Sequence, residues 1–283
     1  IQSSVGVANV DLLFRDEPGD RGQYFSGHVS TDQFNIGQII QTPILGHVTM
    51  DATVEAKIAK EWYGGNNIKL HKLKIKELDF NKYKYRDIFA EGTYTSNSFD
   101  GKIVSNDPNL NMMFQGLFTF NKESSNKYKF YADIPYANLK ELNIDNRFEK
   151  LEISMNVQSN FVKTHDNNIV GYVNVEDAHL NNSNNKYHFD RIRLSSAENH
   201  RDSIYTASVE SPFIKAKYKG KATIIDFIKR IKEIAIASKI DNFLQDNRIR
   251  EHSIGEYELD IVTNNSIGIC DVLMPGLYIH QDT

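Results

Sequence analysis

The chain has 283 residues, of which 40% are hydrophobic and 25% are charged, and its net charge is -4 at pH 7. This composition is typical of a folded protein and excludes a chain that is disordered throughout. The slightly acidic balance argues against nucleic-acid binding, which usually needs a basic excess. The single cysteine, Cys270, excludes an internal disulfide framework, and we interpret it as a small apolar residue.

The two ends of the sequence indicate a piece of a longer protein. The first residue is Ile1 rather than Met, and Thr283 follows an apolar stretch. No signal peptide opens the chain, and no run approaches the roughly 20 apolar residues that a membrane-spanning helix needs. The absence of a targeting or anchoring segment here therefore says nothing about the full-length protein.

Alternation of apolar and polar residues predicts that most of the chain is β-strand. Alternate side chains of a strand point to opposite faces, so each alternating run predicts one apolar and one wet face. Shorter runs of this kind occupy residues 110–120 and 128–134. The two clearest apolar stripes are Val48, Met50, Ala52, Val54, Ala56 and Ile58, and Leu151, Ile153, Met155 and Val157.

Irregularities in the pattern predict bulges and turns. Between Ile68 and Phe80 the apolar positions shift by one residue twice, which would turn the apolar face over unless bulges or bends absorb the shift. We therefore expect an elongated, mostly antiparallel curved sheet whose strands bend. Stretches rich in Asn, Asp, Gly and Ser predict hairpin loops at 64–67, 121–126, 165–168 and 181–185.

One segment has a helical period. Apolar residues recur through 224–244 with basic and acidic residues opposite them, Thr223 is the expected N-cap, and Asp226 lies in the first turn. Shorter helical turns are expected at 35–40 and 136–142. The predicted organisation is a β-rich repeat region over 1–222, an amphipathic helix over 223–245, and the truncated start of the next β unit over 246–283.

The sequence contains no recognisable catalytic motif. None of the nine histidines has the HExxH spacing of a metalloprotease, and there is no GxSxG elbow or glycine-rich phosphate loop. Asp177 and His179 could point the same way from a strand, with His188 across a hairpin, but exposed polar residues are the favoured interpretation over a metal site. The Asp107-Pro108-Asn109 stretch predicts a turn. We expect no catalytic activity, no cofactor and no metal.

Basic residues alternate with apolar ones over 69–76 and 82–86. Such interleaving can bind single-stranded nucleic acid. The favoured interpretation is the solvent face of strands whose other face is buried, so no nucleic-acid partner is expected.

A series of short blocks, in this order and spacing, resembles the central region of TamB-family proteins, the translocation and assembly module group of the AsmA-like superfamily. The resemblance runs from about Tyr24 to the end of the chain. The blocks are FNIG (34–37), LGHVTMDA (45–52), LDFNKYKY (78–85), FDGK (99–102), DPNL (107–110), FQG (114–116), YHFD (187–190), IRLSS (192–196) and MPGLYI (274–279).

The resemblance implies a periplasmic segment of an inner-membrane-anchored envelope protein of a Gram-negative bacterium. Members of the family look like long rods whose sheet folds lengthwise into an apolar-lined trough, and they are implicated in phospholipid transport toward the outer membrane. It also implies an outer-membrane β-barrel assembly protein as a partner of the full-length chain. The family has no catalytic residues to carry over.

Three functions remain open from the sequence. The first is a hydrophobic groove for phospholipid acyl chains, lined by the two apolar stripes, whose small or flexible side chains leave room for a chain. The second is a structural or adhesive β-rod with a closed core, as in a sandwich or solenoid. The third is a carbohydrate-directed protein, which the single tryptophan, Trp62, makes less attractive.

Overall fold

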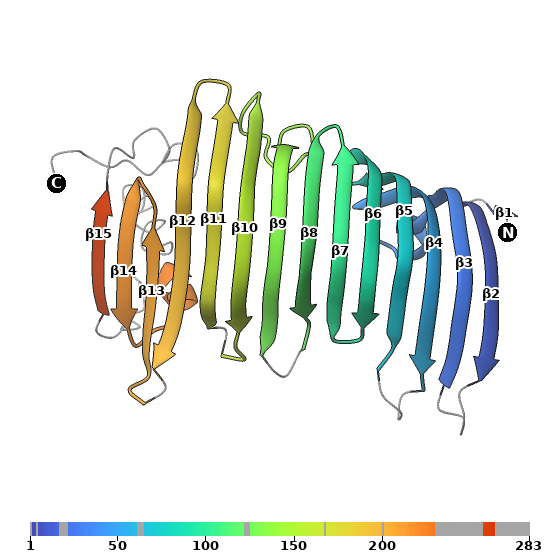
Figure 1. The fold of residues 1–283 in the computed structure, drawn as a ribbon, viewed down its shortest axis with the longest axis horizontal. Helices are drawn as coiled ribbons and strands as arrows, with labels where there is room; N and C mark the ends of the chain where they lie inside the picture. The colour runs from blue at the N-terminus through green and yellow to red at the C-terminus, as the bar shows by residue number, and fades with distance from the viewer. Residues whose placement is uncertain are drawn as a thin grey trace, which may run out of the picture. The chain divides into compact units, whose positions relative to one another are not determined.

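The computed structural model describes residues 2–3, 5–16, 22–60, 65–121, 125–166, 168–199, 201–229 and 257–263. Within them the chain is mostly β, and fifteen strands pair in chain order into one sheet, each strand beside its neighbours in sequence (Figure 1). The registers that run from β1 to β9 and from β12 to β15 are all antiparallel. The sequence-based prediction of a mostly β, antiparallel fold is confirmed.

The strands have the following bounds: β1 Gln2–Ser3, β2 Gly6–Asp16, β3 Gly22–Asn35, β4 Leu45–Ala59, β5 Asn67–Phe80, β6 Tyr83–Thr95, β7 Ser98–Asp107, β8 Leu110–Thr119, β9 Asn126–Asn138, β10 Leu151–Lys163, β11 Ile169–Asn182, β12 Lys186–Asn199, β13 Ile204–Glu210, β14 Ile214–Gly220 and β15 Tyr257–Thr263. Helix α1 spans Ile36–Ile39.

Contacts divide the chain into two compact units. Unit 1 consists of Ile1–Lys122, Tyr128–Gln158 and Asp177–His188. Unit 2 consists of Glu123–Lys127, Ser159–Glu176 and Phe189–Thr283. Strands β9, β10, β11 and β12 therefore contribute residues to both units.

The described residues of the predicted hairpin loops lie between consecutive strands or at strand ends, and residues 64, 122–124 and 167 of these loops lie outside the described residues. The loop before Lys186 shows why the sequence turns there, because the Asn182 side-chain oxygen accepts hydrogen bonds from the backbone N–H groups of Asn184 and Asn185, at 3.0 and 2.7 Å. This is the local hydrogen bonding for which asparagine is favoured in turns. The Pro108–Asn109 pair is likewise a turn, as predicted, and joins β7 to β8.

Bulges absorb the two shifts in the alternation of β5. The register of β4 on β5 changes between Thr49 and Met50 and again between Thr53 and Val54, which leaves Lys76 and His71 as the extra residues of β5. Each extra residue restores the apolar side chains that follow it to the same face. The bulges predicted from the sequence are therefore confirmed.

The strands of unit 1 share one apolar face. Partner residues form rows across the strands, because directly opposed side chains of neighbouring strands point to the same side. One row runs from β4 to β9 through Ala52, Leu73, Ala90, Ile103, Phe114 and Ala132. The next row is Val54, Leu70, Gly92, Gly101, Gly116 and Phe130.

A small core covers part of this face. Tyr85, Ala137 and Leu142 are buried together, and Leu142 is fully inaccessible to solvent. Leu142 belongs to the turn after β9, where its N–H bonds to the Asn138 carbonyl at 3.1 Å. The helical turn expected at 136–142 is wrong for residues 136–138, which end strand β9, and residues 139–142 form a hydrogen-bonded turn that packs onto the sheet.

The two other helical predictions are at 35–40 and 224–244. Helix α1 is confirmed, with the Asn35 side chain accepting from the Gln38 N–H at 3.0 Å. Residues 224–229 are helical, as predicted, and the remainder of the expected helix lies outside the described residues. The predicted boundary at residue 245 lies there too, as do Trp62 and Cys270, so the predicted division of the chain stays a prediction. Within the described residues, no helix is both long and apolar enough to cross a membrane.

Candidate apolar groove

The strands of unit 2 separate apolar from charged side chains. Along β14, Ile214, Ala216 and Tyr218 alternate with three lysines. Ala216 pairs with Val209 on one side and with Ile261 on the other, while Lys217 pairs with Ser208 and Asp260. One face of β12–β15 is therefore apolar and the other polar.

A groove of about 580 Å³ lies on the apolar face. Its volume falls within the ~300–1,000 Å³ that small-molecule sites commonly occupy. The lining is contributed by β10 to β15 and by the helix, and its apolar members are Phe161, Ile169, Val173, Leu194, Ala207, Val209, Ala216, Ile224, Phe227, Ile228, Leu259 and Ile261. Among the described lining residues Lys217 alone carries a charged side chain.

Several large lining side chains remain in contact with solvent. Leu194, Ile228 and Ile261 have 41%, 47% and 54% of their surface exposed. Exposed apolar surface is unfavourable by about 25 cal/mol per Å², so a groove of this kind gains free energy when apolar matter covers it.

The start of the helix is fixed over this face by an aromatic cluster. Phe227 is 5% exposed, and its ring centroid lies 4.5 Å from that of Tyr218 and 5.2 Å from that of Tyr257. The Tyr218 hydroxyl donates to the Ala222 carbonyl at 2.8 Å, just before the helix. Burial raises the pKa of Tyr218, so the phenol stays neutral beside the groove.

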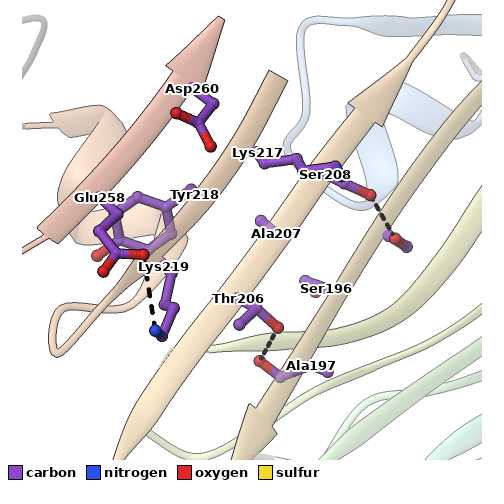
Figure 2. A pocket seen from close by; sticks show the side chains of 11 residues that line it. Ser196, Ala197, Thr206, Ala207, Ser208, Lys217, Tyr218, Lys219, Glu258 and Asp260 are labelled. Carbon is purple, nitrogen blue, oxygen red and sulfur yellow. Dashed lines mark hydrogen bonds and ion pairs between the residues drawn. The ribbon is translucent and has the colours of Figure 1, made fainter. Parts of the chain in front are cut away.

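The opposite face of the same strands is polar. Figure 2 shows the side chains around a hollow of about 400 Å³ there, with Lys219 directed at Glu258, 3.6 Å away. The hydroxyls of Ser195 and Ser208 are 2.8 Å apart across β12 and β13. A side chain moved by one position along β13 or β14 therefore changes from an apolar to a polar environment.

The residues predicted to line a lipid groove lie elsewhere, in unit 1. The structure brings the two stripes to one face, because Val48 pairs with Leu78, and both Leu78 and Ile153 pack against the cluster around Tyr85. Val48, Ala52 and Leu151 are buried, and Ile58 is 37% exposed. The remaining six, Met50, Val54, Ala56, Ile153, Met155 and Val157, are half-buried.

The unit 2 groove was missed by the sequence analysis, although a signal was present. Ile214, Ala216 and Tyr218 alternate with lysines as clearly as the two predicted stripes alternate with polar residues. Strand β15 falls in the β unit predicted over 246–283, yet nothing in the sequence indicates that this strand shares a face with β12.

The structure also locates two groups of polar residues that were singled out from the sequence. The basic residues of β5 and β6 face acidic ones: Lys69 pairs with Glu55, Lys74 with Asp51, and the Lys84 ammonium lies 3.2 Å from Glu77. This is the solvent-face arrangement that the sequence favoured over a nucleic-acid surface.

The second polar group lies on β11 and β12 in unit 1. Asp177, His179 and His188 each offer one ligand atom, and these atoms all lie within 4.8 Å of one another. The sequence analysis considered this grouping and favoured exposed polar residues without a metal.

No protein-family model, curated protein or solved structure matches the chain.

Proposed function

We propose that this chain is a segment of a periplasm-spanning envelope protein whose apolar groove holds phospholipid acyl chains on their way to the outer membrane. The observation that carries the proposal is the unit 2 groove, which is apolar on its lining and open to solvent while the back of the same strands is charged. A saturated chain has no hydrogen-bonding groups, so a long apolar surface without charges is the environment that suits it. The resemblance to the TamB family supports the same function and the same location.

The residues of the groove have distinct roles in this proposal. Ala207 and Ala216 leave room for a chain because their side chains are small, and Leu259 and Ile261 add apolar surface on the neighbouring strand. Lys217, the one charged residue of the described lining, belongs to the polar face, where it pairs with Ser208 and Asp260, so its ammonium lies away from the acyl chain. The chain would act by binding alone, without a catalytic residue or a cofactor.

The experiment is mass spectrometry of an organic extract from the full chain, purified without detergent. Phospholipid in about stoichiometric amount is expected from the wild type. Val209→Glu places a carboxylate in the groove and is expected to abolish retention, because acyl chains cannot solvate a charge. Ser208→Glu is the matched control, since it adds the same charge one residue away on the polar face, opposite Lys217. Lipid-free wild-type protein, or equal retention by Val209→Glu, would contradict the proposal.

A closed β-rod is the second candidate, and the cluster around Leu142 in unit 1 favours it there. That side chain fills space on the apolar face rather than leaving it open. A rod with a filled interior would hold no lipid in the extraction experiment. The carbohydrate-directed alternative gains no support from the groove, because the described lining has no carboxylate.

A further inference from the structure

Two histidines and an aspartate form a compact group on the β11–β12 hairpin, apart from the apolar groove. His179 follows Asp177 by two residues on β11, and His188 reaches the same place from β12. The Asp177 Oδ1 atom is 3.1 Å from His179 Nε2 and 3.0 Å from His188 Nε2. The two imidazole rings are stacked, with their centroids 4.2 Å apart and 10° between their planes.

The two nitrogen-to-oxygen separations are close to those between ligand atoms around a small divalent cation. A metal bound tetrahedrally at about 2.0–2.1 Å holds neighbouring ligand atoms about 3.3 Å apart. Both nitrogen-to-oxygen separations fall just short of this value. Binding one ion requires both stacked rings to rotate until their Nε2 lone pairs converge beside Oδ1, and about half of each histidine side chain is exposed to solvent.

We propose that Asp177, His179 and His188 bind a divalent transition metal such as Zn²⁺. Two imidazoles and one carboxylate are the ligands that zinc, copper and nickel prefer, whereas magnesium and calcium prefer oxygen alone. A bound metal would replace the two contacts between Nε2 and the carboxylate, and each neutral imidazole would then carry its single proton on Nδ1. Three protein ligands leave at least one position for water or for a ligand from another molecule.

The three proposed ligand residues lie on neighbouring strands of one hairpin, β11 and β12. The hairpin turn also limits movement of the two strands, because the Asn182 side chain holds the backbone of residues 184 and 185. Ligands from two strands make the metal a link between them, so binding should stabilise the hairpin.

Other histidine–carboxylate pairs of the chain provide matched controls. His28 lies 2.8 Å from Asp51, and both side chains are about as exposed as those of the proposed site, at 46% and 52%. This pair contains one histidine rather than two, and the proposal assigns it no metal. The inference does not depend on the proposed lipid function, which concerns other residues.

The test is calorimetric titration of the metal-stripped full chain with ZnCl₂, followed by thermal melting. One saturable equivalent and a higher melting temperature are expected for the wild type and for His28→Ala. His188→Ala and His179→Ala should each weaken the binding at least tenfold, roughly the effect of disturbing a metal's supporting groups. MgCl₂ should produce no saturable heat.

Two outcomes would overturn the proposal: no saturable zinc binding by the wild type, or zinc binding that survives both His188→Ala and His179→Ala. The metal-free variants should melt at the same temperature as the metal-free wild type, because both histidine rings are exposed. Loss of zinc binding in a folded variant then reports on the site itself. Asp177→Asn is a further variant for the zinc titration, since it keeps the size of the side chain and removes its charge.

Discussion

A single carboxylate organises the junction of β6, β7 and the turn that follows. Asp107 is 3% exposed and accepts hydrogen bonds from the Tyr83 hydroxyl at 2.6 Å, the Arg86 N–H at 2.8 Å and the Asn109 N–H at 2.8 Å. The sequence predicted the turn at this position, because Asp-Pro-Asn is a local signal. It could not predict the bond to Tyr83, which lies 24 residues earlier and is brought there by strand pairing.

Because Tyr83 is bonded to Asp107 at this junction, we expect the protein to lose stability at high pH. Burial, and then the hydrogen bond to Asp107, raise the pKa of Tyr83 from 10.0 to about 12. In the unfolded chain the phenol ionises near pH 10, so its contribution is complete below pH 10 and is lost as the pH rises to about 12. The free energy of unfolding should therefore fall more steeply over this window in the wild type than in Tyr83→Phe.

Urea unfolding at several pH values measures the difference. Tyr83→Phe should also be less stable at pH 7, by about 1–2 kcal/mol, because Asp107 loses one of its hydrogen bonds. Tyr94→Phe is the control, since Tyr94 is 44% exposed and its removal leaves the contact with Asp107 in place. Identical pH profiles for the wild type and Tyr83→Phe would refute the prediction.

At the scale of elements, local sequence patterns predict the strands and helix caps, whereas contacts between elements determine where these elements lie. The bulges at Lys76 and His71 follow from the shifts in apolar parity alone. The row of glycines from Gly92 to Gly116 had no such signal. A Cβ on Gly101 would lie 2.5 Å from the Glu91 carbonyl oxygen and 2.8 Å from the Phe99 ring, a restriction that appears only when the strands are side by side.

The helix start at Thr223 is an element that can be tested by itself. The Thr223 hydroxyl accepts from the Asp226 N–H at 3.2 Å and donates to the Asp226 carboxylate at 2.8 Å. Thr223→Ala removes both contacts from a side chain that is 6% exposed. We expect a loss of about 1 kcal/mol in the free energy of unfolding, the usual effect of removing an N-cap.

Chemical unfolding followed by circular dichroism checks this value. Thr206→Ala is the control in the same unit, because Thr206 is exposed and its bond to the Ala197 carbonyl is long, at 3.4 Å. Thr223→Ala should also weaken lipid retention, since Phe227 and Ile228 of the helix line the groove. Equal stability of the two variants would show that the cap does not hold the helix start.

At the scale of the whole molecule, the sequence predicted strand pairing better than it predicted which surface would be open. Alternation gave an apolar face for nearly every strand, and the loops gave hairpins, which together imply pairing in chain order. Neither signal states what covers that face. In unit 1 Leu142 covers part of it from a turn, and in unit 2 the helix start leaves a groove beside it. Both outcomes depend on contacts between residues distant in sequence.

The stripe of β4 now allows a test that separates an open groove from a closed core in unit 1. Val54 is half-buried and pairs with Gly27 on one side and Leu70 on the other. In a closed core, Val54→Glu would bury an unpaired charge and lower the free energy of unfolding by several kcal/mol. In a groove the carboxylate can meet water, so the protein stays folded, but the charge obstructs acyl chains.

For Val54→Glu we expect a melting temperature near that of the wild type and loss of outer-membrane integrity in cells that depend on the full-length protein. Met155→Glu, on the second stripe, should behave in the same way. Thr53→Glu is the matched control, because Thr53 is exposed on the opposite face and pairs with Lys72, which can receive the new charge. A strongly lowered melting temperature for Val54→Glu but not for Thr53→Glu would establish a closed core in unit 1. A stable and fully functional Val54→Glu would show that this stripe does not carry lipid, and would leave the unit 2 groove as the place where acyl chains bind.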